Sequence, residues 1–449
     1  MKRIFIDILR LSQFVQLRVF SSKTFQRQIR VRSKIDMDLK CRENPIVTKL
    51  DTPEFKSILS PEIMELKRLF DKYHYEIRIA GGAVRDLLLG QTPTDIDLAT
   101  VATPQEMKDM FTKEGVRLIN MNGEKHGTIT PRINDKENFE VTTLRIDMIT
   151  DGRHAEVEFT TDWKLDANRR DLTINSMFLG FDGSVYDYFF GYEDLHKRLV
   201  AFVGDADKRV KEDYLRIMRY FRFYGKIAEC PDNHQAQTLE ILKRNVEGLQ
   251  IISGERIWVE LKKTLQGKYA GHLLKAILDI GVGPYIGLPE HPNIDELDRL
   301  IKQSEHLNLN PMSYLSALIR DIDEATALYS RLKFSSFERD MVYFLVQHRG
   351  DKVADRPLLP YERLVLDAKI KQANAVEYVR EVMKYRGDET LLKEFHNWDI
   401  PRFPISGKVL KENGVPPGKS YGLIISKLKD IWINNEYKQS SDDLIKYLP

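Results

Sequence analysis

The chain has 449 residues, with 69 lysines and arginines against 67 aspartates and glutamates, so its formal net charge is only +2. This balance argues against a protein that binds nucleic acid through overall positive charge. Hydrophobic residues make up 42% of the sequence and charged residues 30%, a globular composition, and the length predicts about two to four domains. The sequence has only two cysteines, Cys41 and Cys230, and no long apolar run, so we expect no disulfide framework, no structural zinc site and no membrane span.

The positive charge is concentrated at the amino terminus. Residues 1–35 contain nine basic residues and one acidic residue, so this segment carries +8 and the rest of the chain −6. An arginine-rich, acid-poor and amphipathic segment is typical of a mitochondrial transit peptide, which we place at residues 1–36. The alternative is a basic arm that contacts nucleic acid. We expect a mitochondrial protein, with a second form in the cytosol or nucleus if translation also starts at Met37.

The segment after this leader predicts a mixed α/β module. Ser60-Pro61-Glu62 predicts the start of a helix that continues to Phe70. A strand over 75–80 ends at Gly81-Gly82, and a helix follows over 83–89. A capping box at Thr103 opens another helix. Further strands are expected at 95–99, 116–119, 126–133 and 139–146.

Helical patterns dominate from about residue 193 to the end. We therefore expect an α+β protein, with an α/β head over 37–186 and an otherwise helical chain. Breaks in the helical pattern divide that chain into a neck over 187–266, a body over 267–355 and a tail over 356–449.

The most informative pattern is a strand, a Gly81-Gly82 turn, a helix, and then Asp95-Ile96-Asp97 on the next strand. Residues i and i+2 of a strand share a face, so the two aspartates are expected side by side, a pair that suits a hard divalent metal. The glycines allow close approach of a ligand to a helix N-terminus, whose free N–H groups suit phosphate. Arg85 lies one turn further along the same helix.

This arrangement resembles the nucleotidyltransferase superfamily that includes DNA polymerase beta, and within it the branch of tRNA CCA-adding enzymes and bacterial poly(A) polymerases. The resemblance implies attack of an RNA 3′-hydroxyl on the α-phosphate of a nucleotide, with two Mg²⁺ ions held by Asp95 and Asp97. It also implies phosphate contacts from Gly82 and Arg85. Glu140 is the candidate for a third catalytic carboxylate from a neighbouring strand. The alternative is an exposed strand residue.

The segment Arg169-Arg170-Asp171, followed by Leu-Thr-Ile-Asn, resembles a second motif of this family. The resemblance implies that these residues hold the sugar and triphosphate of the nucleotide, a task that suits the guanidinium fork. A surface cluster of ion pairs is the alternative.

A third motif begins at Lys211 and is expected to form one helix. Its charged residues recur at every third position, and three arginines on one face repel each other unless an anion such as triphosphate lies across them. The alternative is an amphipathic helix with a solvated charged face. The charged residues concerned are Asp213, Arg216, Arg219 and Arg222.

Within this motif, Glu212-Asp213-X-X-Arg216 resembles the segment with which the family selects the base. The resemblance implies that Asp213 and Arg216 act as a template in the neck, with Glu212 orienting Arg216. A carboxylate accepts from the exocyclic amine of C or A and the guanidinium donates to the adjacent ring acceptor, whereas U and G present a carbonyl oxygen. The motif therefore predicts a pocket for CTP and ATP.

Two further segments resemble the family. Ser253 to Leu261 matches a fifth motif, which we interpret as the structural start of a helix. In the tail, Lys408 and Lys419 flank a glycine-proline turn before a helix over 421–432, where we expect an RNA phosphate contact. A plain helix–helix turn is the alternative. The resemblance covers about residue 60 to the end and is thin between 270 and 400.

We expect an enzyme that adds C, C and A to the 3′ end of tRNA, its partner, with CTP and ATP as substrates. Poly(A) polymerases and partial CC- or A-adding enzymes share these motifs, and 121–126 and 147–156 are candidate positions for the loop that governs the switch from C to A. An inactive RNA-binding scaffold disagrees with the intact acidic and arginine motifs. A metal-dependent phosphohydrolase disagrees with the lack of any His-Asp dipeptide.

Overall fold

The computed structural model describes residues 40–119, 121–150, 155–351, 356–416, 418 and 420–448. The expected transit peptide, Met37 and Lys419 lie outside these residues. The described chain divides into two compact units, one ending at Tyr285 and the other beginning at Ile286. No helix within the described ranges combines the length and apolar character needed to cross a bilayer. Cys41 and Cys230 are both free thiols.

The first unit begins with the α+β head that the sequence predicts. Among the described residues, nine strands form one mixed sheet in the order β1-β11-β10-β2-β3-β7-β5-β4, with β6 paired to β5. A separate hairpin joins β8 and β9. The strands are β1 (Ile46–Lys49), β2 (Ile77–Ala80), β3 (Asp97–Thr100), β4 (Arg117–Ile119), β5 (Thr128–Ile133), β6 (Glu137–Asn138), β7 (Glu140–Thr143), β8 (Arg145–Thr150), β9 (Ala155–Phe159), β10 (Phe178–Leu179) and β11 (Ser184–Tyr186).

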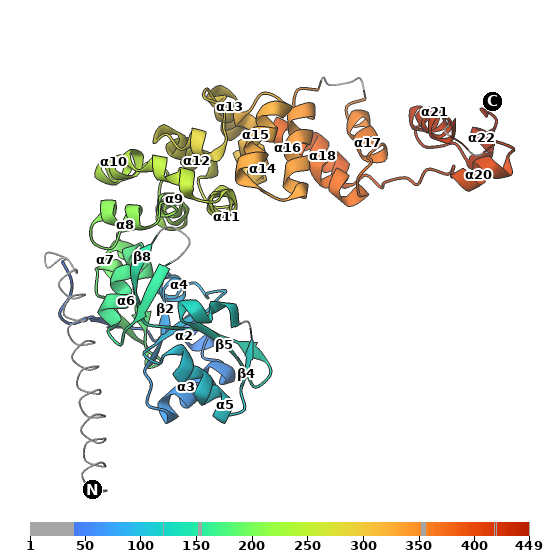
Figure 1. Cartoon of the computed structure of the whole chain (residues 1–449). Coiled ribbons are helices and arrows are strands. Elements are labelled where there is room, and N and C mark those ends of the chain that lie inside the picture. Colours follow the sequence, from blue (N-terminus) through green and yellow to red (C-terminus); the bar gives the residue numbers. More distant parts are fainter. Residues whose placement is uncertain are drawn as a thin grey trace, which may run out of the picture. The chain divides into compact units, whose positions relative to one another are not determined.

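The helices of the head follow the predicted start signals. Ser60 and Thr103 cap α3 and α5 with their side chains, and Thr103 forms the predicted capping box with Glu106. The two helices lie side by side against the β4–β5 part of the sheet (Figure 1), where Phe70 and Phe111 meet edge to face. The head helices are α2 (Pro53–Ser57), α3 (Pro61–Lys72), α4 (Gly82–Leu88), α5 (Pro104–Lys113), α6 (Trp163–Arg169) and α7 (Gly191–His196).

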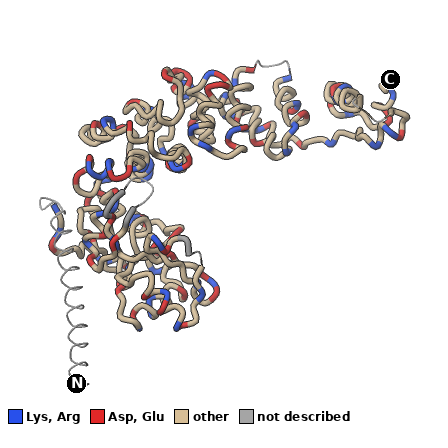
Figure 2. The backbone as a smooth tube through the Cα atoms, viewed as in Figure 1, with Lys and Arg blue, Asp and Glu red and all other residues tan. Residues whose placement is uncertain are grey.

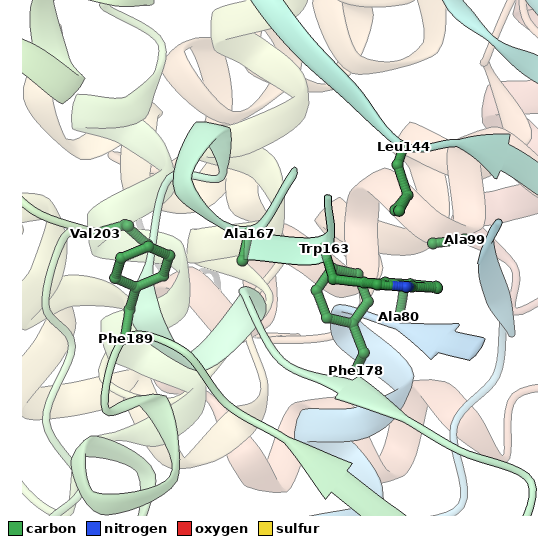
Figure 3. Close-up of a cluster of buried hydrophobic side chains, with 8 residues drawn as sticks. All are labelled: Ala80, Ala99, Leu144, Trp163, Ala167, Phe178, Phe189 and Val203. Carbon is green, nitrogen blue, oxygen red and sulfur yellow. The ribbon is translucent and has the colours of Figure 1, made fainter. Parts of the chain in front are cut away.

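A small aromatic core supports the middle of the sheet. Trp163 of α6 lies edge-on against Phe178 of β10, with 4.9 Å between the ring centroids, and both pack beside Ala80 at the end of β2 (Figure 3). All four residues of β2 are buried, as expected for a central strand that immediately precedes the glycine turn. This core fixes the end of β2 from which the predicted phosphate-binding turn departs.

Two strand predictions were wrong in detail. Residues 139–146 form two strands, β7 and β8, because the chain turns at the buried Leu144 and β8 pairs with β9 instead of continuing in the large sheet. The strand expected at 95–99 begins only at Asp97, so Asp95 precedes it.

The rest of the first unit is helical, as expected. Its helices are α8 (Ala206–Glu212), α9 (Arg216–Ile227), α10 (Ala236–Arg244), α11 (Gly254–Leu265) and α12 (Ala270–Asp279). Helices α9, α11 and α12 pack against one another. The apolar side chains of α9 are buried, with Met218 and Phe221 both fully inaccessible.

The second unit is helical throughout its described residues. Its helices are α13 (Ile294–Ser304), α14 (Pro311–Leu318), α15 (Ile322–Leu332), α16 (Ser336–His348), α17 (Leu359–Leu366), α18 (Gln372–Arg386), α19 (Glu389–His396), α20 (Gly407–Glu412), α21 (Ser420–Asn434) and α22 (Ser441–Ile445). Within each unit, acidic and basic residues are interspersed along the chain (Figure 2). The predicted helix over 421–432 is confirmed as α21, and Trp432 anchors a small core with Leu410 and Leu444.

Candidate active site

One cavity of the first unit, about 1140 Å³ in volume, brings the sequence-predicted residues together. Its walls come from the turn after β2, the start of β3, β7, the segment after α6, and helices α9 and α11. Twelve of the predicted site residues line it: Gly82, Arg85, Asp95, Asp97, Glu140, Arg169, Arg170, Asp171, Asp213, Arg216, Arg219 and Arg222. Glu212 does not line the cavity and contacts Arg216 instead.

The acidic side of the cavity is formed by Asp95, Asp97 and Glu140. Asp97 opens β3, and Glu140 is its direct neighbour in the parallel register of β7. Burial raises the pKa of Asp97, Arg170 partly opposes this, and the charge of Asp95 adds to it. The two aspartates are therefore electrostatically coupled, although Asp95 lies before the strand and not on it as predicted.

The glycine turn after β2 depends on Gly81 as much as on Gly82. Gly81 has φ +65°, and a Cβ there would lie 2.9 Å from Nη1 of Arg170. The turn therefore needs glycine both for its backbone angle and for space. Gly82 begins α4 and lines the cavity, and the first N–H groups of a helix have no intrahelical acceptor.

Arg85 is more enclosed than the sequence predicts. Its side chain lines the cavity, but the residue is only 4% exposed, and its guanidinium donates to Asp86 at 3.0 Å and to Asn175. Burial lowers its pKa despite the nearby carboxylate of Asp86. Its contact with a phosphate stays a prediction.

Arg169 and Arg170 are both held by Asp166, a carboxylate that is 1% exposed. Oδ1 accepts from Nε of Arg169 at 2.8 Å, and Oδ2 accepts from Nε and Nη2 of Arg170 at 3.2 and 3.1 Å. Oδ1 also accepts from the backbone N–H of Arg145 at 3.2 Å. Burial disfavours the charge of Asp166, but the two arginines outweigh it and lower its pKa. One buried anion therefore orients both guanidinium groups.

The helix expected from Lys211 onward is interrupted at Asp213. Helix α8 ends at Glu212, Asp213 has an extended backbone, and α9 starts at Arg216. Oδ1 of Asp213 accepts from the backbone N–H of Leu215 at 3.1 Å, and Oδ2 accepts from Nη2 of Arg256 at 2.8 Å. The break presents Asp213 at the cavity wall and not on a helical face.

The arginines of α9 need no external anion, contrary to the expectation from their spacing. Each has a carboxylate of the protein nearby, at 2.6 Å for Arg216 with Glu212, 2.6 Å for Arg219 with Asp171, and 2.7 Å for Arg222 with Glu260. Arg216 also donates to the carbonyl oxygens of Arg209 and Arg169 at 3.0 and 3.1 Å. The guanidinium groups are thus fixed before any ligand binds.

Sequence reasoning missed three supporting residues. Asp166 precedes Arg169 and Arg170 by three and four residues, the spacing at which side chains meet on a helix. This pairing could therefore have been predicted from the sequence. Arg256 and Glu260 lie in the fifth motif, which we interpreted as a helix start. That helix exists as α11, but these two side chains reach across to Asp213 and to the arginines of α9. No local signal indicates such contacts between helices.

Of the remaining predicted positions in the first unit, Asp147 of the second candidate switch segment lines the cavity. Lys408 of α20 is exposed and lies 3.8 Å from Glu412, and the first candidate switch segment, 121–126, forms a short 3₁₀ helix. The second, 147–156, belongs to the β8–β9 hairpin, and its tip falls outside the described residues. Their roles stay predictions.

Replacing Asp166 by asparagine should destabilise the protein. Removing one partner of a buried ion pair costs about 3–5 kcal/mol because the other charge is left without compensation. Since the folded pKa of Asp166 is lowered, its stabilisation is present above the pKa of an unfolded aspartate and is lost as the pH falls through the lowered value. Urea unfolding at pH 7 and in acid should show a difference from the wild type that shrinks in acid. The exposed Asp109→Asn variant serves as the control, and equal stability of the two variants would contradict the role of Asp166.

Comparison with known proteins gives the family. Residues 77–201 match the poly A polymerase head domain, and 235–293 match a domain described as a probable RNA and SrmB-binding site of polymerase A. The mitochondrial CCA tRNA nucleotidyltransferase 1 of Mus musculus is 50% identical over 404 residues, which cover 89% of this chain and 92% of the mouse protein. The CCA-adding enzyme of Lactobacillus helveticus is 29% identical over 83% of this chain and 93% of its own.

Solved structures agree in fold. The Bacillus stearothermophilus CCA-adding enzyme, crystallised with CTP, aligns with a TM-score of 0.69 and 25% identity over 88% of this chain and 97% of its own. The Thermotoga maritima CCA-adding enzyme, in a complex with tRNA, aligns with a TM-score of 0.62 at 19% identity over 89% and 98%. On the identity and coverage of its mouse relative, the chain belongs to the CCA tRNA nucleotidyltransferase family of enzymes.

Proposed function

We propose that this enzyme adds C, C and A to the 3′ end of tRNA, using CTP and ATP and releasing pyrophosphate. The observation that carries the proposal is the single cavity that contains both the acidic group around Asp97 and the Asp213–Arg216 pair. The names of its relatives agree, because the mouse protein is a CCA tRNA nucleotidyltransferase. The mouse protein is also named as mitochondrial, which supports mitochondrial import of this chain; an additional form from Met37 remains part of the proposal.

The group of Asp95, Asp97 and Glu140 suits Mg²⁺, an ion for which the protein supplies only some of the ligands. Within the described residues, no set of three or more histidine, cysteine, aspartate or glutamate side chains forms a complete metal site. Mg²⁺ is usually held by one or two carboxylates together with substrate phosphates and water, so Asp95 and Asp97 suffice as the protein ligands of two ions. Bound there, Mg²⁺ would lower the charge on the reacting phosphate and favour ionisation of the attacking hydroxyl. The register that sets Glu140 beside Asp97 supports Glu140 as the proposed third catalytic carboxylate.

Base selection would use the hydrogen-bonding capacity that the protein leaves open on Asp213 and Arg216. Each carboxylate oxygen of Asp213 accepts one protein donor, so each retains capacity for a second. An ionised carboxylate only accepts hydrogen bonds. A carbonyl of U or G facing this carboxylate would stay unpaired, at a cost of about 1–3 kcal/mol. The pair therefore favours C and A.

The closest alternatives are a poly(A) polymerase or a partial CC- or A-adding enzyme. Both would use the same cavity and differ in how addition stops. A catalytically inactive RNA-binding scaffold is less consistent with the cavity, because Asp95, Asp97, Asp213 and Arg216 are all present in it.

Primer extension separates these alternatives. The protein is incubated with Mg²⁺ and tRNA that lacks its 3′ CCA, with CTP, ATP or both, and the products are sized. We expect two additions with CTP alone and a third when ATP is also present. Long A tails would indicate a poly(A) polymerase, a stop after CC a partial enzyme, and no extension an inactive scaffold.

Replacing Asp213 by alanine should weaken selection of the nucleotide. Loss of one acceptor that distinguishes an amine from a carbonyl should reduce the ratio of kcat/KM for CTP over UTP by about 10- to 100-fold. The matched control is Asp232→Ala, which removes an exposed aspartate outside the cavity. Unchanged discrimination in Asp213→Ala would contradict the template role.

Replacing Asp97 by asparagine should have opposite effects on stability and activity. The raised pKa of Asp97 means that the folded protein disfavours its charge, a cost present above the folded pKa and absent below the pKa of an unfolded aspartate. The metal-free variant should therefore unfold at a higher temperature at pH 7, with the gain vanishing in acid. Its rate should fall by at least about 100-fold, because transition-state stabilisation of several kcal/mol depends on the ligand. A variant that is less stable, or retains its rate, would contradict this role.

A further inference from the structure

Two lysines at the edge of the cavity belong to none of the proposed catalytic, nucleotide-binding or base-selecting groups. Lys263 lies near the end of α11, and Lys268 lies in the turn between α11 and α12. Both line the cavity and both are exposed. We call them the rim lysines.

The rim lysines differ from the other cations of the cavity in their pairing. Each of the nine other lysines and arginines in its lining has an aspartate or glutamate within 4 Å, as Arg219 has Asp171 and Lys226 has Asp86. In the part of the chain that the structure describes, neither rim lysine has an acidic partner. They are therefore the cavity's unneutralised positive charges.

The turn that carries Lys268 lies close to α9 at Gly225. A Cβ at Gly225 would lie 3.2 Å from the backbone oxygen of Lys268 and 2.8 Å from the side chain of Leu273. The absence of a side chain at this position of α9 lets the α11–α12 turn approach closely. The backbone at Lys268 therefore lies close to α9, while the side chains of both lysines are exposed.

We propose that Lys263 and Lys268 bind backbone phosphates near the 3′ end of the RNA primer. This inference rests on the proposed function and names how its RNA substrate enters the site. The cavity, at about 1140 Å³, exceeds the roughly 300–1,000 Å³ of sites that hold one small ligand, which leaves room for an RNA end beside a nucleotide.

The chemistry of lysine suits RNA better than the triphosphate. The arginine forks inside the cavity are fixed by carboxylates and suit a nucleotide that binds in one geometry. The primer end moves by one nucleotide at each addition, so its phosphates pass the rim in changing positions. A flexible ammonium group, which requires no defined direction, can follow them and carries no base preference.

The test compares two double variants with the same change in charge. Lys263→Gln with Lys268→Gln removes the rim, and Lys113→Gln with Lys243→Gln removes two exposed lysines of the same unit that do not line the cavity. Binding of a tRNA acceptor-stem hairpin with a short 3′ overhang is followed by fluorescence anisotropy at several salt concentrations, without nucleotide. Binding of CTP is titrated separately.

For the rim variant we expect an RNA Kd about tenfold higher than for the control variant, and a slope of log K against log salt shallower by about 1.4, the value for two contacts to single-stranded RNA. The Kd for CTP should change less than about twofold. Equal RNA affinity in the two variants would overturn the inference, and so would weakened CTP binding with unchanged RNA binding, which would assign the lysines to the triphosphate. Because binding needs no catalysis, a wild type that binds RNA without extending it would refute the proposed function alone.

Discussion

The site depends on carboxylates that fix guanidinium groups before any substrate arrives. Asp166 is the clearest case, since it is almost completely buried and its two oxygens hold both Arg169 and Arg170. Taking such a carboxylate out of water is costly and is offset only by close, well-directed donors. The same device recurs at Asp171, Glu212 and Glu260, each of which holds an arginine of α9. Arginine forks that are already oriented lose little conformational entropy when they bind an anionic ligand.

These ion pairs also join separate elements into one wall. Arg219 of α9 links the segment after α6, through Asp171, to α11, through Glu260. Arg256 of α11 reaches Asp213 in the break between α8 and α9. The break itself matters, because a continuous helix would direct Asp213 along a helical face, whereas the extended backbone lets its carboxylate accept from Leu215 and Arg256. The position of the proposed base template therefore depends on three elements distant in sequence.

This dependence explains how far the sequence could predict the site. The strand, glycine turn, helix and Asp-X-Asp pattern uses local signals, and the structure has those elements in that order, with β3 shorter than expected. The three-residue spacing also predicted that the arginines of α9 share one face, and all three line the cavity. It could not reveal that Glu260 and Asp171 neutralise them, because those contacts join residues 38 to 48 positions apart in the chain. The interruption at Asp213 was missed because residues 211–222 keep a helical period across it, and only tertiary contacts indicate the change in backbone direction.

The distribution of charge follows from the same pairing. Residues 36–449 carry a net charge of −6, so overall attraction cannot bring a polyanion to this part of the chain. What matters is which charges remain unneutralised after the internal ion pairs form. In the cavity, these are the acidic group of Asp95, Asp97 and Glu140 and the two rim lysines. The unpaired carboxylates suit a metal ion and the unpaired lysines suit phosphate, so a protein that is acidic overall can still present local groups complementary to both. Affinity for RNA in such a protein has to come from a few placed contacts, which also allows the RNA end to leave and reposition between additions.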